Sequence, residues 1–195
     1  KTEKIIDLDA HSMMAIAGSP AVAFEMARTL QTAFEYYRRS QLQLMSLEAK
    51  VRALSRLIAD NLPATLQGVG AVAPIFAGLG QAESDGSDAG RPVIYFYDPM
   101  GANFEAAAFA SSGSGSAHIK SILSYLENWG DPRPAEMDLP GAVNLANRLL
   151  MTAAEFDSAT GGVQPDKDHF GTIKTLSRAG VESVAPERQA EFWNG

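Results

Sequence analysis

The chain has 195 residues, of which 46% are hydrophobic and 20% charged, so it can bury one sizeable core and is predicted to form a single domain over residues 1–195. Sixteen Lys and Arg against 23 Asp and Glu give a formal net charge of -7, which argues against nucleic acid as a partner. Charged residues interrupt every long apolar stretch, which argues against a membrane span. The absence of cysteine excludes disulfides and thiolate nucleophiles and favours a cytoplasmic location.

The first half of the chain carries signals for hairpins and long helices. Ser19 followed by Pro20 provides an N-cap and a proline at the first helical position, and Ser46 caps a second helix that Pro63 is expected to end or kink. The elements expected here are a hairpin of strands Ile5–Leu8 and Met13–Ala17, helices Pro20–Ser40 and Ser46–Leu62, and a strand Gly70–Leu79 that is buried on both faces.

The second half begins with a loop at Gly80–Gly90 and continues with strands and helices. The expected elements are strands Pro92–Tyr97 and Phe104–Ala110, a helix that follows the Ser111–Ser116 connection, a helix over Leu139–Phe156, a strand Phe170–Leu176, a turn at Arg178–Gly180 with a short strand from it to Val184, and a helix from Pro186. Paired helices between runs of strands predict an α+β fold in which two antiparallel sheets pack face to face with helices outside.

Three glycine-bearing junctions could carry chemistry, because small residues let main chains approach closely and leave amides free to hold an anion or a polarised carbonyl. They are Ala17–Pro20, Gly113–Ser116 and Asp157–Gly162. Taken singly, each is more often a tight turn. Gly113–Ser116 could also cradle a phosphate, although no Walker lysine follows Ser116.

The three histidines, His11, His118 and His169, are isolated in the sequence and specify neither a catalytic triad nor a zinc motif. Asp166, Asp168 and His169 could coordinate a divalent ion, although a solvated loop is the more frequent interpretation of such a turn. The sequence therefore assigns no metal and no cofactor.

Five motifs, taken together and in order, resemble those of the proteasome β subunit, most closely its bacterial and archaeal forms. The motifs are KIIDLDAHSMMAIAGSPAVAFEMAR, NLPATLQGVGAVAPIFAGLG, YFYDPMGANFE, SGSGS and DSATGG. The resemblance covers essentially the whole chain. It implies the four-layer αββα sandwich of the N-terminal nucleophile hydrolases, which agrees with the order of elements above.

The activity that the resemblance implies is peptide-bond hydrolysis by an N-terminal threonine, exposed when a propeptide is removed and using its own amine as base. Lys4 matches the lysine that lowers the cost of activating the threonine hydroxyl. Gly18 matches the glycine whose amide stabilises the oxyanion. Ser114, Asp157 and Thr160 match the residues that support the terminal amine, with Thr160 in place of the commoner serine.

The catalytic threonine and the aspartate of the family's first hairpin have no counterpart in this chain. Thr2 is not the nucleophile, because its register relative to Lys4 places it in the family's third strand. We expect a missing N-terminal segment rather than a naturally shortened protein, because loss of a hairpin would expose an apolar sheet edge. The alternative is a catalytically inactive β-type subunit with a structural role in assembly.

The partners implied by the resemblance are other β subunits and proteasome α subunits in stacked seven-membered rings, an ATP-dependent unfoldase, and peptide or protein substrates. The family also places a substrate pocket at five positions that are mostly apolar and uncharged here, which implies a preference for large apolar residues. The matching residues are Thr2, Ile6, Ile16, Pro20 and Phe24. Core packing would explain Ile6, Ile16 and Phe24 equally well.

Overall fold

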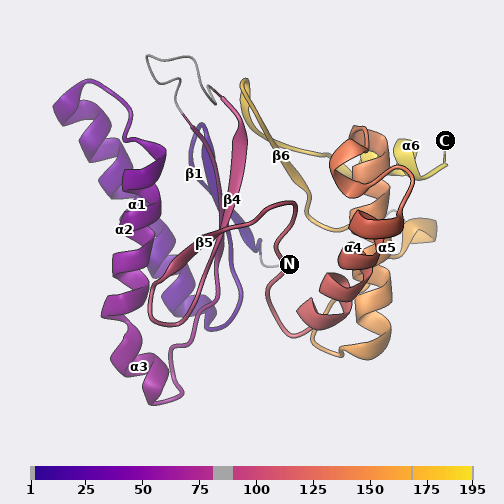
Figure 1. Ribbon diagram of the computed structural model, residues 1–195, viewed down its shortest axis with the longest axis horizontal. Coiled ribbons are helices and arrows are strands. Elements are labelled where there is room, and N and C mark those ends of the chain that lie inside the picture. The colour runs from indigo at the N-terminus through magenta and orange to yellow at the C-terminus, as the bar shows by residue number, and fades with distance from the viewer. Residues whose placement is uncertain (1–2, 81–89, 168, 195) are drawn as a thin grey trace. The chain divides into compact units, whose positions relative to one another are not determined.

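The computed structural model describes residues 3–80, 90–167 and 169–194 (Figure 1). The chain forms two compact units, and a single domain over residues 1–195 remains a prediction. The first unit comprises Lys1–Ala106 and Leu176–Glu182, and the second comprises Ala107–Thr175 and Ser183–Gly195.

The first unit is a five-stranded antiparallel meander with helices on one face. Figure 1 shows α1 and α2 lying along the same side of this sheet. The strand order is β1-β2-β3-β4-β5, so every strand pairs with its neighbour in the sequence. The elements are β1 (Ile5–Asp9), β2 (Ser12–Ala15), α1 (Pro20–Gln41), α2 (Leu47–Asp60), α3 (Leu62–Leu66), β3 (Ile75–Leu79), β4 (Pro92–Tyr97) and β5 (Asn103–Glu105).

The strand register builds a continuous apolar row on the helix-covered face. Met14 pairs with Ile6 on one side and with Phe76 on the other, and Phe76 pairs in turn with Tyr95. Met14 and Phe76 are fully buried. This row forms the sheet side of the hydrophobic core. α1 and α2 complete that core with the buried side chains of Met26, Leu30, Phe34, Val51, Leu54 and Ile58.

The opposite face of the same sheet is apolar as well. Ile75 pairs with Ala15 and Phe96, and Phe96 stacks on Phe104 with ring centroids 5.4 Å apart. A strand alternates its side chains between faces, so apolar residues on both faces are typical of a sheet that forms an inner layer. The sequence of this sheet therefore suits the inner layer that the expected sandwich contains.

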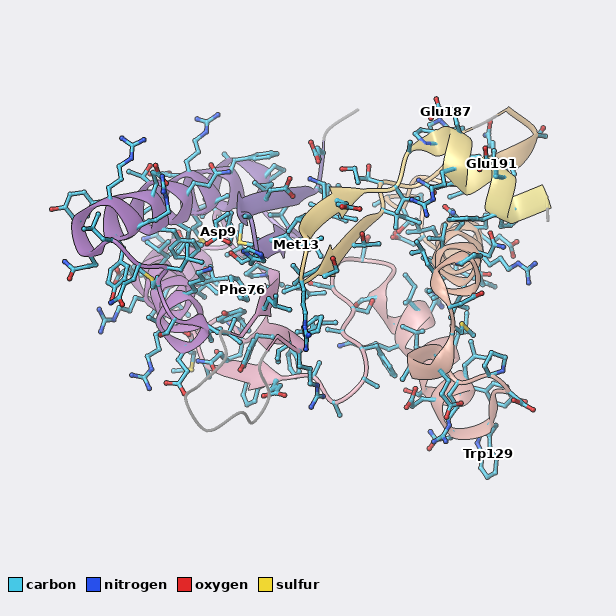
Figure 2. The ribbon with its side chains drawn as sticks, turned by 90° about the horizontal axis from the view of Figure 1, so that it is seen from above. Asp9, Met13, Phe76, Trp129, Glu187 and Glu191 are labelled. Atoms are coloured by element: carbon cyan, nitrogen blue, oxygen red, sulfur yellow. The ribbon has the colours of Figure 1, made fainter. Side chains whose placement is uncertain are left out.

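A buried ion pair joins the helices to the sheet in the first unit. Lys50 of α2 places its Nζ 2.6 Å from Asp9 Oδ2 at the end of β1, and the same Nζ lies 5.4 Å from the Phe34 ring centroid. Asp9 Oδ1 accepts hydrogen bonds from the Ser12 hydroxyl and the His11 amide. Asp9 is labelled in Figure 2. Each charge thus has a partner of opposite sign, which offsets the cost of removing both groups from water.

The second unit is mainly helical, and Figure 1 shows α4 and α5 side by side. Its core includes an amide network, in which Asn147 Nδ2 donates to Gln189 Oε1 and Gln189 Nε2 donates to the Gly171 carbonyl. The Gly171 amide donates back to Asn147 Oδ1. The elements are α4 (Ser116–Trp129), η1 (Pro134–Glu136), α5 (Leu139–Phe156), η2 (Pro165–Lys167) and α6 (Pro186–Asn194).

A second sheet consists of β6 (Lys174–Ser177) and β7 (Gly180–Ser183). The two residues between them allow only an antiparallel hairpin. The tip of this hairpin belongs to the first unit, where the Val181 amide donates to the Ala10 carbonyl at 2.9 Å. Gly180 has a φ of +121°, and a Cβ there would lie 2.9 Å from the same carbonyl oxygen. This contact therefore requires glycine.

The α+β class with two antiparallel sheets and helices is confirmed, and so is the expected order of strands and helices, to which the structure adds α3. The expected bounds of β4 and α5 are confirmed as well. The predicted end of the second helix, Leu62, is wrong. The helix α2 ends at Asp60, and Pro63 lies in the first turn of α3. Proline fits there because a first-turn N–H has no helical acceptor.

Three expected strands are shorter than predicted. Within Gly70–Leu79 the continuous strand begins only at Ile75, directly after Pro74. Before the proline the segment pairs through a single isolated bridge, from Val72 to Gly18, and the burial of the strand alternates instead of covering both faces. Phe104–Ala110 is reduced to Asn103–Glu105, with residues from Ala107 on belonging to the second unit. Phe170–Leu176 begins only at Lys174, because Gly171 binds the Asn147 and Gln189 amides.

Candidate functional site

The second unit holds a compact polar network centred on Asp157. The Ser114 hydroxyl and the Thr160 hydroxyl each donate to Asp157 Oδ2 at 2.5 Å, and the Ala159 amide donates to Oδ1 at 3.2 Å. Asp157 is the C-cap of α5, and its own amide donates to the Ala153 carbonyl. The three residues that the resemblance groups as amine support are therefore in direct contact.

These contacts fix the charge of the network. Hydrogen bonds from Ser114 and then Thr160 hold the pKa of Asp157 below its ordinary value, with smaller help from the Ala159 amide and the charge of His118. The carboxylate is consequently ionised at neutral pH. Because both hydroxyls direct their protons to Asp157, their lone pairs remain available to accept from a cationic donor such as an ammonium group.

The loop that carries Ser114 depends on two glycines. Gly113 has a φ of +100°, and its carbonyl accepts from the Ser116 amide at the start of α4. Gly115 is buried, and a Cβ there would lie 2.8 Å from Thr160 Oγ1 and 3.3 Å from Asp157 Oδ2. The missing side chain at Gly115 thus lets the loop approach the network, which is the close approach expected of the small residues at this junction.

The arrangement argues against a phosphate cradle at Gly113–Ser116. The Ser114 hydroxyl, which would donate to a phosphate oxygen, already donates to the Asp157 carboxylate. An ionised carboxylate beside the loop also repels a phosphate. The ionised Asp157 carboxylate therefore favours a positively charged group over an anion at this place.

The Gly18 junction lies in the first unit, where β2 leads into α1. Gly18 forms an isolated antiparallel bridge with Val72, whose two hydrogen bonds come from the flanking residues, Ser19 to Ala71 and Ala73 to Ala17. This bridge therefore leaves the amide of Gly18 itself unused. The φ of +92° and a virtual Cβ position 2.2 Å from the Ala71 oxygen make glycine obligatory, while the residue stays exposed.

Lys4 also belongs to the first unit, at the entry to β1. Its carbonyl accepts from the Ile16 amide at 2.8 Å, which ties it to the strand that leads to Gly18, and its side chain is exposed. The structure thus places the candidate residues in two groups. Lys4 and Gly18 lie in one unit, and Ser114, Asp157 and Thr160 lie in the other.

The expected pocket residues all belong to the first unit, but Thr2 lies outside the described residues. Ile16 is a member of the core, and Ile6 and Phe24 are partly buried against that same core. Pro20 is exposed at the first position of α1. Three of the five residues therefore contribute to one apolar cluster, which is compatible with a pocket wall and with simple core packing.

Two residues near Asp157 were given no site role by the sequence. The His118 ring stacks on the Phe156 ring with centroids 5.1 Å apart. They occupy the first turn of α4 and the last position of α5, next to the network. An isolated histidine carries no sequence signal for such a contact, because the contact depends on how two helices pack.

The suggested metal site after Pro165 gains no structural support. Within the described ranges, no three His, Cys, Asp or Glu side chains are grouped so that they could hold a metal ion. Asp168 itself lies outside those ranges.

The helices that the structure describes include none long and apolar enough to cross a membrane.

Comparison with known proteins gives consistent results. Residues 1–164 match the family described as Proteasome subunit. The chain is 35% identical over 185 residues to the Proteasome subunit beta of Acidothermus cellulolyticus, covering 95% of this chain and 61% of the relative. Proteins of the same name from Stackebrandtia nassauensis (34% identical; 97% and 64% covered) and Acidimicrobium ferrooxidans (33%; 97% and 65%) are similar to it as well. The chain spans a little under two thirds of the length of these curated relatives.

Proposed function

The chain belongs to the Proteasome subunit family, and from that premise we propose that it is part of a threonine-type endopeptidase subunit of a bacterial proteasome core. The proposed activity is hydrolysis of peptide bonds in unfolded proteins inside an enclosed chamber in the cytoplasm. The observation that carries the proposal is the network in which Ser114 and Thr160 both donate to Asp157. Its charge and its available lone pairs suit the terminal amine of a threonine nucleophile.

In the proposed reaction, the threonine lies N-terminal to Lys1 in the whole protein. Its hydroxyl oxygen attacks the carbonyl carbon of the scissile peptide bond while its proton moves to the threonine amine. The tetrahedral intermediate collapses, the C–N bond breaks, and the amine returns the proton to the leaving nitrogen. Water then hydrolyses the resulting ester and regenerates the hydroxyl.

The residues of this chain contribute charge and hydrogen bonds to these steps. The Lys4 ammonium favours the ionised form of the attacking hydroxyl. The Gly18 amide, which its bridge with Val72 leaves unused, is suited to donate to the developing oxyanion. Asp157, with Ser114 and Thr160, binds and orients the amine so that it can exchange a proton with the hydroxyl.

The proposal is tested in the full-length protein assembled with its α partner. We expect Lys4→Ala to abolish peptide cleavage with assembly retained, because the role of Lys4 is local and electrostatic, and Asp157→Asn to have nearly the same effect. Lys120→Ala, which removes an exposed lysine of α4, is the matched control and should cleave normally. Wild-type turnover by assembled Lys4→Ala particles contradicts the proposal.

Sequencing the mature N-terminus provides an independent test. A threonine at the position expected of the nucleophile supports the peptidase. A different residue there contradicts the peptidase and supports the alternative, a catalytically inactive β-type subunit with a structural role in assembly.

We further propose that the protein assembles with other β subunits and with α subunits in stacked seven-membered rings that receive substrate from an ATP-dependent unfoldase. Support comes from the names of the relatives and from exposed apolar residues at the end of α1 and beyond, where Tyr36 and Leu42 are 73% and 91% exposed. Sedimentation of the full-length protein with its α partner should give a large particle. A species that stays monomeric refutes this assembly.

The proposed substrate preference is for a large apolar residue before the scissile bond. Ile6, Ile16 and Phe24 form one apolar cluster, and burying a leucine or aromatic ring against such a wall gains about 1.5–3 kcal/mol. A substrate charge has no partner among these side chains and would be penalised. Fluorogenic peptides ending in tyrosine or leucine should therefore be cleaved faster than those ending in arginine or glutamate, and the reverse order contradicts the pocket assignment.

A further inference from the structure

We propose that His118 and Phe156 form a positioning pair that holds the Ser114 loop against the Asp157 carboxylate. The catalytic consequence of this pair rests on the proposed function, whereas its geometry does not.

The pair joins the same two chain segments as the network does. His118 lies in the first turn of α4, shortly after Ser114, and Phe156 is the last residue of α5, directly before Asp157. The two rings stack with centroids 5.1 Å apart and an interplanar angle of 26°. A hydrogen bond alone lets the two segments rotate about the line joining donor and acceptor. A second contact beside it removes that freedom.

Burial does not account for this pair. Phe156 is 67% exposed and His118 is exposed, so the contact removes little apolar surface from water. Offset ring stacking has a defined geometry, and both side chains have few rotatable bonds, so ordering them costs little entropy. The stack therefore contributes orientation rather than core stability.

His118 also acts through charge. After the hydrogen bonds from Ser114, Thr160 and the Ala159 amide, the electrostatic interaction with His118 is a further cause of the lowered pKa of Asp157. Ring contact and charge can be separated by substitution. His118→Phe retains a ring without charge, His118→Lys retains charge without a ring, and Phe156→Ala removes the other half of the stack.

The first measurement uses NMR of the full-length protein, with amide exchange recorded at one neutral pH and the Asp157 carboxyl followed through an acid titration. The readouts are hydrogen exchange of the Ala159 amide, which donates to Asp157 Oδ1, and the pKa of the Asp157 carboxyl. We expect His118→Ala and Phe156→Ala to speed exchange between about twofold and tenfold and to raise that pKa. His118→Phe should restore slow exchange, and His118→Lys should not.

Tyr125→Ala is the control, because Tyr125 is another exposed aromatic of α4, two turns beyond His118. It should leave both readouts unchanged. If His118→Ala and Phe156→Ala behave like Tyr125→Ala, or if His118→Lys restores slow exchange and His118→Phe does not, positioning by the stack is refuted.

The second measurement is peptide cleavage by full-length particles. Misplacing a catalytic group costs rate with little effect on substrate binding, so His118→Ala should lower kcat on the order of tenfold with KM unchanged, and His118→Phe should rescue it. If the wild-type particle has no activity, the proposed function is contradicted. The positioning role of the ring pair is then tested by the NMR measurement alone.

Discussion

Lys50 Nζ lies 2.6 Å from Asp9 Oδ2, and only 4% of the Lys50 side chain is exposed, against 22% of Asp9. The pair connects α2 to the end of β1 inside the first unit. Because Lys50 is the more deeply buried partner, the two halves of the pair are not equivalent. Loss of Asp9 leaves a buried ammonium without a counter-ion, whereas loss of Lys50 leaves a carboxylate that still reaches water.

The first prediction follows from this asymmetry. We expect Asp9→Asn to lower the free energy of unfolding by about 3 kcal/mol and Lys50→Met by about 1–2 kcal/mol, with the double variant recovering part of the larger loss. Arg52→Met, which removes an exposed ion pair with Glu48, should cost about 0.5 kcal/mol or less. Urea denaturation of the four variants measures these differences, and equal losses for Asp9→Asn and Arg52→Met would show that the buried pair has no special weight.

The second prediction concerns acid. Burial alone would raise the pKa of Asp9, but the hydrogen bond and charge of Lys50, with Ser12 and His11, outweigh it and hold the pKa below the ordinary 3.8. The unfolded chain then binds more protons, so this contribution to stability is complete above about pH 4 and is lost as pH falls through the folded-state pKa. Urea unfolding between pH 5 and pH 2 should show a smaller decline in Asp9→Asn than in the wild type. Parallel declines would contradict the assignment.

The third prediction separates a backbone effect from a steric one. Gly18 and Gly68 both have positive φ, +92° and +77°, but a Cβ at Gly68 meets nothing within 4 Å. Gly68→Ala should cost about 1–2 kcal/mol from the left-handed backbone alone. Gly18→Ala should cost about 1–3 kcal/mol more, because the Ala71 carbonyl blocks its Cβ. Thermal unfolding of the two variants tests this, and equal shifts in Tm would mean that the Ala71 segment moves aside freely.

The fourth prediction uses Gly115, whose Cβ would lie 2.8 Å from Thr160 Oγ1. Gly115→Ala should push the Ser114 loop away from Asp157 and cost about 1–3 kcal/mol of stability. It should also raise the pKa of Asp157, since the hydrogen bonds from Ser114 and Thr160 are the largest causes that lower it. Gly161→Ala is the matched control, because nothing lies within 4 Å of its Cβ position. NMR titration of the Asp157 carboxyl in both variants measures whether the pKa rises only in Gly115→Ala. An unchanged Asp157 pKa in Gly115→Ala would show that the network tolerates the added methyl group.

Local sequence signals determined many of the elements. Asp138 caps α5 by accepting from the Gly141 amide, and Ser46 caps α2 by accepting from the Ala49 amide, so both helix starts could be predicted from residues within one turn. The order of strands and helices, and with it the α+β class, follows from such signals. The grouping of Ser114 with Asp157 and Thr160 came from resemblance, because no local rule pairs Ser114 with a residue so far along the chain.

Only the tertiary structure decided the contacts between residues far apart in the chain. The Lys50–Asp9 pair, the Asn147–Gln189 amides and the His118–Phe156 stack each join separate elements. The isolated bridge between Val72 and Gly18, which continues the register of β2 and β3 beyond Ile75, has the same origin. Periodicity and capping depend on neighbours within a few residues, whereas these contacts depend on which surfaces pack together, and that is determined by burial over the whole chain.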